Sequence, residues 1–167
     1  GDSSWTLAGG NTRPDMAETI SALVAQGGAY TLETISPAGE HRYERITSIR
    51  KVIPWTADLA GLVAQGADAA TRIISFTVTE AGYYLDAANR LDLANFADLR
   101  ADVDAARAGQ AGPTIYAALT AILRERMRRA SGPVTLLNCD NLRHNGDRSR
   151  AGLLQFIELI GDTALRD

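Results

Sequence analysis

The sequence predicts one α/β domain built on a largely parallel β-sheet. Its 167 residues suit a single compact domain of ordinary size. Short apolar runs alternate with longer segments of helical period, which is the pattern of a sheet whose strands are connected by helices. The single cysteine, Cys139, allows no internal disulfide, so a hydrophobic core must hold the fold, and a domain of this length can bury one.

The first third of the chain predicts a strand, a helix and a β-hairpin. The strand covers Trp5–Ala8, and the helix covers Pro14–Gln26, where proline suits the first helical turn. Two β-rich runs follow at Tyr30–Ile35 and His41–Ile46, and the residues between them are typical of a turn. These two runs indicate an antiparallel excursion from the sheet.

The middle of the chain predicts two helices and the best strand of the sequence. A helix over Trp55–Gln65 ends at Gly66, and the strand Arg72–Val78 follows, which we place at the buried centre of the sheet. A short helix is expected at Phe96–Arg107.

The last third predicts a long helix over Thr114–Ala130 with one apolar face, a buried strand at Pro133–Leu137 and a final helix over Arg148–Ile160. Four arginines crowd the end of the long helix. They are either a phosphate-binding patch or, as we prefer, cations that complement the helix C-terminus on a solvated face. These residues are Arg124, Arg126, Arg128 and Arg129.

The composition argues against several classes of partner. Seventeen basic residues against twenty acidic ones give a net charge of −3, so neither nucleic acid nor an anionic membrane surface is an expected partner. The longest uncharged stretch, Gly109–Leu123, is shorter than the ~20 apolar residues of a membrane-spanning helix. With one cysteine and no secretion signal, we expect a cytoplasmic protein.

Polar residues follow two of the predicted strands, where open parallel sheets bind their ligands. Thr79 and Glu80 come after the strand at 72–78, and Asn141 comes after the strand at 133–137. The Asn141 carboxamide could donate a hydrogen bond to an oxygen that gains charge. Glu80 and Asn141 could equally be turn residues. We predict that the two strand ends lie side by side and that Glu80 and Asn141 face a common hollow.

The neighbouring residues predict less chemistry. His144 is expected to be solvated, Cys139 to be a small buried thiol, and Asn145 or Asp147 to cap the final helix. No spacing of His, Cys and carboxylate residues suits a metal ion, so no metal site is expected. The dinucleotide-binding motif G-x-G-x-x-G is absent from the sequence.

Three stretches resemble a known family. Ile73–Asp86 and Leu137–Gly146, together with Ile46–Val52, are similar to the polyol-specific long-chain dehydrogenases, the mannitol dehydrogenase family. The resemblance covers nearly the whole chain and is strongest to members that act on D-arabinitol. Members that act on mannitol or reduce hexuronates are close alternatives.

The resemblance implies a Rossmann-like NAD-binding domain followed by a mostly helical catalytic domain. Residues 1–167 would form part of the first domain, a parallel sheet with helices on both faces and a β-hairpin excursion. In the family, a first strand and a Gly-rich loop precede the matching segment, and the helical domain follows it. We therefore expect the sheet to be incomplete at its N-terminus and the missing helical domain to be a partner of this chain.

The resemblance also implies roles for particular residues. Asn141 matches the asparagine that binds the alcohol or ketone oxygen beside the cofactor, and Glu80 matches a strand-end glutamate near the reaction centre. Thr79 precedes that glutamate and is expected to bind the cofactor. Asp15 falls near the acidic residue that contacts the adenosine ribose, which favours NAD over NADP. Lys51, the only lysine, does not match the family's catalytic lysine, so the chain alone is not expected to oxidise polyols.

The expected function is the NAD-dependent oxidation of a secondary alcohol of a sugar alcohol to the ketose, as from D-arabinitol to D-xylulose. Oxidation of mannitol and reduction of a hexuronate remain alternatives within the family. A non-catalytic module that binds a nucleotide or a partner protein is the alternative of a different class, and the missing Gly-rich loop favours it.

Overall fold

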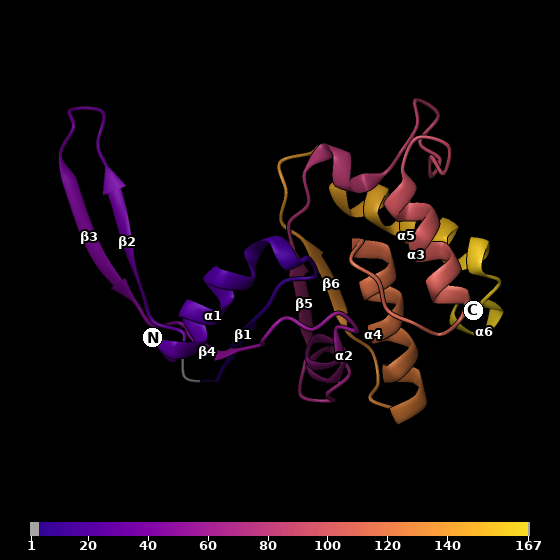
Figure 1. Ribbon diagram of the computed structural model, residues 1–167, viewed down its shortest axis with the longest axis horizontal. Coiled ribbons are helices and arrows are strands. Elements are labelled where there is room, and N and C mark those ends of the chain that lie inside the picture. Colours follow the sequence, from indigo (N-terminus) through magenta and orange to yellow (C-terminus); the bar gives the residue numbers. More distant parts are fainter. Residues whose placement is uncertain (1–3, 167) are drawn as a thin grey trace. The chain divides into compact units, whose positions relative to one another are not determined.

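The computed structural model describes residues 4–166, apart from the side chain of Glu80 (Figure 1). The chain divides into two compact units, Gly1–Thr56 and Ala57–Asp167. Each unit has its own parallel pair of strands and its own helices. Within the described range, no helix combines the length and the apolar composition that crossing a membrane requires.

The first unit contains a parallel strand pair and one helix. Strands β1 (Leu7–Gly9) and β4 (Ile49–Val52) pair with Gly9 opposite Val52. The predicted helix is confirmed as a 3-10 turn, η1 (Pro14–Met16), that continues into α1 (Ala17–Ala25). Gly28, just after this helix, has a φ of 83°, and a Cβ atom there would overlap the carbonyl of Ile49. Glycine is therefore required where the chain turns away from the helix.

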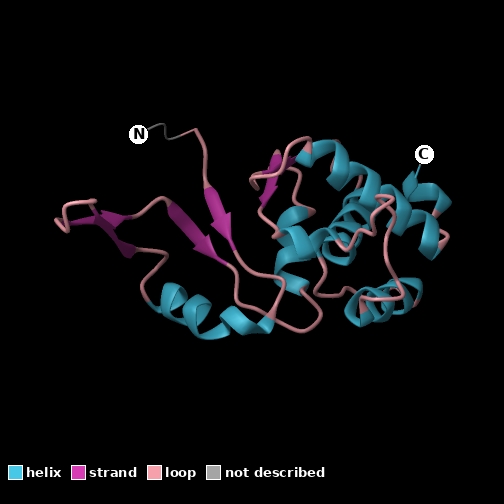
Figure 2. Ribbon diagram, turned by 90° about the horizontal axis from the view of Figure 1, so that it is seen from above, coloured by secondary structure: helices cyan, strands magenta, loops and turns pink. Residues whose placement is uncertain are grey.

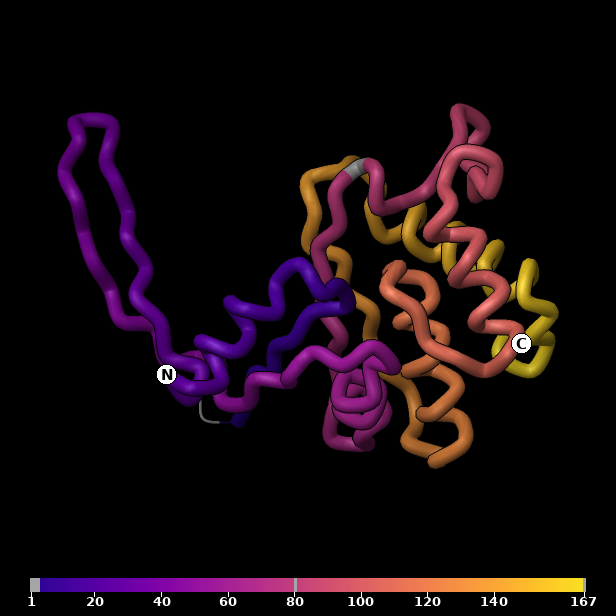
Figure 3. The backbone as a smooth tube through the Cα atoms, viewed as in Figure 1, coloured from indigo at the N-terminus to yellow at the C-terminus, as the bar shows by residue number. Residues whose placement is uncertain are grey.

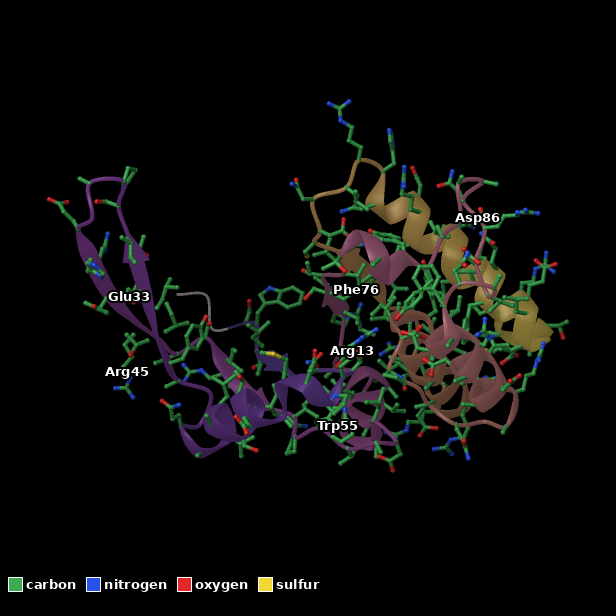
Figure 4. All side chains as sticks on the ribbon, turned by 45° about the horizontal axis from the view of Figure 1, so that its top comes forward. Arg13, Glu33, Arg45, Trp55, Phe76 and Asp86 are labelled. Carbon is green, nitrogen blue, oxygen red and sulfur yellow. The ribbon has the colours of Figure 1, made fainter. Side chains whose placement is uncertain are left out.

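The hairpin of the first unit is confirmed with the predicted bounds. Strands β2 (Tyr30–Ile35) and β3 (His41–Ile46) pair in antiparallel register, with all β2 side chains exposed. Figure 4 shows Glu33 on this hairpin as one of its outward-pointing side chains. Its carboxylate lies 2.6 Å from His41 Nδ1 and accepts a hydrogen bond from the Tyr43 hydroxyl, and these contacts lower the pKa of Glu33.

The second unit pairs two parallel strands and packs them against helices (Figure 2). Strand β5 (Ile73–Phe76) lies beside β6 (Thr135–Asn138), with Phe76 opposite Asn138. The helices of this unit are α2 (Ala60–Gly66), α3 (Ala97–Arg107), α4 (Ile115–Arg129), α5 (Asn145–Ile160) and α6 (Thr163–Arg166). The predicted helices that correspond to α3, α4 and α5 are confirmed.

The core of the second unit lies between α3, α4 and α5. Its buried residues include Leu99, Tyr116 and Phe156, and the rings of Tyr116 and Phe156 stack with centroids 6.3 Å apart. Thr114 caps α4 by accepting a hydrogen bond from the Ala117 N–H at 3.3 Å. The buried carboxylate of Asp102 on α3 accepts from the Thr114 N–H at 2.7 Å, which fixes the start of α4 against α3.

Strand β5 is not the buried centre that its apolar run predicts. Ile74 and Phe76 pack against the helical core, whereas Ile73 on the opposite face is 44% exposed. On β6, Leu136 packs inward and Leu137 is 46% exposed. The helices of this unit therefore cover one face of the strand pair, because alternate residues of a strand point to opposite faces.

Helix α2 begins at Ala60, five residues later than the sequence predicts. Leu59 is buried with a left-handed backbone conformation (φ 52°), which is incompatible with a helix running through it. The Asp58 carboxylate accepts from the Ala60 N–H at 3.1 Å and closes the turn before the helix.

The interpretation of the α4 arginines as cations on a solvated helix end is confirmed for Arg128 and Arg129, which are exposed, and is wrong for Arg126, which is buried. Arg128 and Arg129 both bind Glu125, and these two contacts, Arg128 first, lower the pKa of Glu125 to about 2. Arg124 pairs with Asp162 at 2.6 Å. Arg126 is buried, and its guanidinium donates only to backbone carbonyls: those of Gly66, Asp68, Thr71, Ser131, Gly132 and Pro133.

Candidate active site

The carboxyl ends of β5 and β6 open side by side, as predicted. The strands are parallel and in register to Phe76 and Asn138, and the Cys139 N–H donates to the Phe76 carbonyl at 2.9 Å just beyond them. Figure 3 shows the segments that leave these two strands close together at the same end of the pair. The segment after β5 forms a 3-10 turn, η2 (Glu80–Tyr83).

Tyr83 connects the two segments that leave the strands. Its ring is buried, with 2% of the residue exposed. The hydroxyl donates a hydrogen bond to Asp140 Oδ2 and accepts one from Asn138 Nδ2 at 2.7 Å. The backbone carbonyl of Tyr83 accepts from the Tyr116 hydroxyl at 3.1 Å, so the helical core holds the residue at its other end.

Side chains also hold the loop after β6 internally. Asn138 Oδ1 accepts from the Asp140 N–H at 3.2 Å, and Asp140 Oδ1 accepts from the Leu142 N–H at 3.1 Å. The Asn145 carboxamide donates to the Asn138 and Asp140 carbonyls. Asn138 and Asp140 are therefore the residues whose side chains close the turns of this loop.

The ionisation of this network is well defined. Burial first, and then the hydrogen bond to Asp140, raise the pKa of Tyr83 to about 12. Burial alone would raise the pKa of Asp140, but hydrogen bonds from Tyr83 and the Leu142 N–H outweigh it and lower that pKa. At neutral pH the bond therefore joins a neutral phenol to a carboxylate, which is stronger than a bond between neutral groups.

Asn141 stands at the tip of the turn between Asp140 and Leu142. It is exposed, and no hydrogen bond of its carboxamide is found among the side chains that the structure describes, which do not include that of Glu80. The turn bonds on both sides come from the side chains of Asn138 and Asp140, and the Asn141 carboxamide has two N–H donors whose hydrogen bonds a ligand could accept. This is the state that an oxygen-binding role requires.

The structure describes the other three predicted site residues to different extents. Glu80 begins η2, but its side chain lies outside the described part of the structure, so the common hollow with Asn141 stays a prediction. Thr79 is exposed at the start of η2, and its carbonyl accepts from the Gly82 N–H at 2.8 Å. Asp15 is exposed in η1 of the first unit.

Two expectations about neighbouring residues are wrong. Cys139 is exposed because alternation along the strand turns it away from the core that Asn138 faces. Asn145 does not cap α5: its carboxamide reaches back to the loop, and His144, with φ 57°, precedes the helix without a side-chain cap. His144 is solvated, as expected, with Asp147 at 3.7 Å.

Tyr83 is the residue that the sequence does not single out as functional. A phenol between Gly82 and Tyr84 is visible in the sequence, but its partners lie 55 and 57 residues further along the chain. Only the pairing of β5 with β6 brings them together. No sequence signal distinguishes Tyr83 from Tyr84, whose hydroxyl binds Asp98 at 2.8 Å instead.

A hollow of about 630 Å³ lies elsewhere in the second unit. It is lined by residues 57–63 around the start of α2, the loop 109–111 and residues 121–128 of α4. None of the predicted site residues lines this hollow, and neither do Tyr83, Asn138 and Asp140. Among the residues that the structure describes, no group of three His, Cys, Asp or Glu residues could hold a metal ion.

Curated relatives match this chain closely over almost its full length. It is 57% identical over 161 residues to a D-arabinitol 4-dehydrogenase of Ralstonia nicotianae, covering 96% of this chain and 33% of that protein. It is 50% identical over 167 residues to a D-arabinitol 4-dehydrogenase of Klebsiella pneumoniae, covering 35% of that protein. A mannitol 2-dehydrogenase of Cereibacter sphaeroides is 36% identical over 156 residues. No protein-family model matches the chain.

Over nearly its whole length the chain is similar to polyol dehydrogenases. It spans about a third of the length of the curated relatives it matches. Two solved polyol dehydrogenase structures have the same fold over this chain. The mannitol 2-dehydrogenase of Pseudomonas fluorescens, in ternary complex with NAD and D-mannitol, superimposes with a TM-score of 0.82 at 27% identity over 98% of this chain and 32% of that one.

A substrate-free D-sorbitol dehydrogenase gives a TM-score of 0.80, also at 27% identity, over 97% of this chain and 33% of that one. The resemblance to polyol dehydrogenases and the mixed, Rossmann-like α/β fold that the sequence predicts are thereby confirmed.

Proposed function

We propose that this chain is part of the NAD-binding domain of a dehydrogenase that oxidises a secondary alcohol of a sugar alcohol to the ketose, with D-arabinitol as the substrate. The observation that carries the proposal is the 57% identity to a D-arabinitol 4-dehydrogenase over 96% of the chain. The strand-end geometry supports it, because Asn141 presents a neutral, uncommitted carboxamide at the edge where such sheets bind ligands.

The residues of the second unit fit a site for an alcohol that becomes a ketone. Asn141 donates to the substrate oxygen and stabilises the charge that it gains when its proton leaves. Both oxygens of Asp140 are engaged by Tyr83 and the Leu142 N–H, so this carboxylate is held in the loop's own hydrogen bonds. NAD, when bound, accepts the hydride from the carbinol carbon.

The remaining assignments follow the family match. Thr79 and Asn141 contact the cofactor, Asp15 binds the adenosine ribose, and Glu80 acts beside the reaction centre. The hydroxyl proton goes to a lysine of the helical domain, and Lys51 on β4 does not take this role. By itself the chain supplies part of the cofactor domain and does not turn over polyols.

A segment exchange tests the proposal. The homologous segment of the Ralstonia nicotianae enzyme is replaced by this chain, and NAD reduction is measured with D-arabinitol, D-mannitol and xylitol. We expect activity that is highest with D-arabinitol. A folded hybrid, with the circular dichroism spectrum and melting behaviour of the parent, that reduces no NAD with any polyol would overturn the proposal.

Mannitol is the second candidate substrate. Mannitol 2-dehydrogenases are the next relatives, at 36% identity and below, and one of them supplies the structural neighbour bound to NAD and D-mannitol. A hybrid that prefers D-mannitol over D-arabinitol by kcat/KM assigns the chain to that substrate. Titration of the unfused chain with NAD in a calorimeter measures what affinity it retains without a Gly-rich loop.

A further inference from the structure

We propose that Tyr83 is a positioning residue, which holds the loop after β6 so that Asn141 faces the ligand edge of the sheet. The inference deepens the proposed function and rests on it for the role of Asn141. It begins from the buried phenol of Tyr83, whose hydroxyl joins Asp140 and Asn138 across the two strand ends.

The first step is the fixed position of Tyr83 itself. The residue is 2% exposed, and its carbonyl accepts from the Tyr116 hydroxyl in the core. Tyr116 in turn is 1% exposed and stacks on Phe156 of α5. The hydroxyl of Tyr83 is therefore placed by packed core residues and does not depend on the loop that it binds.

The second step is the path from Tyr83 to Asn141. Asp140 Oδ2 accepts from Tyr83, while Asp140 Oδ1 accepts from the Leu142 N–H at 3.1 Å. Asn141 lies between these two residues, so its backbone belongs to a turn whose closing carboxylate is anchored to the core. Asn138 reinforces the anchor, because it donates to the Tyr83 hydroxyl and accepts from the Asp140 N–H.

The third step is that the partner of the Asp140 carboxylate in the buried core is Tyr83, whereas its other contacts come from the loop itself and from the start of α5. The remaining hydrogen bonds of this loop, from the Asn145 carboxamide, come from the start of α5 and reach backbone carbonyls. If the phenol hydroxyl is removed, the Asp140 carboxylate keeps these local contacts and its bond from the Leu142 N–H but loses its hydrogen bond to the core. Tyr83→Phe deletes that single hydroxyl and keeps the buried ring.

Amide hydrogen exchange on this chain tests the anchor without any activity. Tyr83→Phe is expected to speed exchange of the Leu142 N–H by about tenfold or more, since a hydrogen bond to a charged group is lost. Asp140→Ala, which removes the acceptor itself, is the second variant and gives at least the same increase. Tyr84→Phe is the matched control: it removes the neighbouring hydroxyl, which binds Asp98, and leaves Leu142 unchanged.

Kinetics of the hybrid enzyme test the consequence for catalysis. Tyr83→Phe is expected to lower kcat for D-arabinitol about tenfold, and Asn141→Ala to lower it about a hundredfold. In the Asn141→Ala background, Tyr83→Phe adds little, because both act on the same donor. Tyr84→Phe keeps the parent kcat.

Different results would overturn the positioning role of Tyr83 and the proposed function. Wild-type-like exchange at Leu142 in folded Tyr83→Phe, or full additivity of the two substitutions on kcat, overturns the positioning role. Absence of polyol oxidation by the unsubstituted, folded hybrid overturns the proposed function, whatever the exchange rates are.

Discussion

Gly152 of α5 lies directly against the phenol of Tyr116 on α4. A Cβ atom at position 152 would overlap the Tyr116 hydroxyl and come within 2.8 Å of Cε1. This close approach lets the Tyr116 hydroxyl reach the carbonyl of Tyr83. The contact between the two helices therefore determines the position of the residue that binds the loop after β6.

Gly152→Ala is expected to destabilise the protein by about 1–2 kcal/mol, because the strain of overpacking exceeds the gain in helix propensity. Urea denaturation followed by circular dichroism measures the change. Gly146→Ala on the same helix is the control, since its Cβ meets no atom within 4 Å, and it should be neutral or slightly stabilising. Equal destabilisation by both substitutions would contradict the role of the close contact.

Arg126→Met is expected to cost about 3 kcal/mol of unfolding free energy, since it takes the donor from several backbone carbonyls, including the buried carbonyl of Gly66. The comparison is Arg129→Met on the same helix, which removes an exposed ion pair with Glu125 and should change stability by about 0.5 kcal/mol or less. Chemical denaturation of both variants measures the difference. A loss at Arg126 no larger than that at Arg129 would show that the carbonyl contacts contribute little.

Tyr83 is expected to ionise only near pH 12 in the folded protein, whereas an unfolded chain releases that proton near pH 10. Because the native pKa is the higher one, the stabilisation is complete below about pH 10 and is lost as the pH rises toward about 12. Phenolate absorbance during an alkaline titration of wild type and Tyr83→Phe isolates this step. If the absorbance step that is present in wild type and absent from Tyr83→Phe had its midpoint near pH 10, the phenol would not be held by a buried hydrogen bond.

Cys139 is expected to react with a thiol reagent in the native protein, because its side chain is exposed after β6. As the only cysteine, it gives one equivalent of labelling, at a native rate within about tenfold of the rate in denaturant. A colorimetric disulfide reagent measures both rates. Labelling that requires denaturant would restore the buried thiol that the sequence suggests.

Local patterns predicted much of this fold, and long-range contacts limited the rest. The hairpin has the predicted bounds because turn residues separate two β-rich runs, and α4 begins next to Thr114 because its hydroxyl caps the helix. The predicted start of α2 was wrong, because helical periodicity does not reveal the left-handed conformation of Leu59. An apolar run also does not say which faces of a strand are covered, so the exposure of Ile73 was missed.

The candidate site divides in the same way. The side-by-side strand ends and the exposed Asn141 follow from the order of strands and polar loops along the chain. The hydrogen bonds of Tyr83 depend on residues more than fifty positions away, for which local sequence carries no signal. The roles of Glu80, Thr79 and Asp15 stay predictions.

The β5–β6 pair is secured at both ends by separate devices. The carbonyls that Arg126 binds lie in the segments entering the two strands, whereas Tyr83 joins the segments leaving them. We therefore expect that local opening where the chain leaves the strands can occur while the contacts of Arg126 stay intact. Substitutions of Tyr83 should then act on local hydrogen exchange, and substitutions of Arg126 on the global free energy of unfolding.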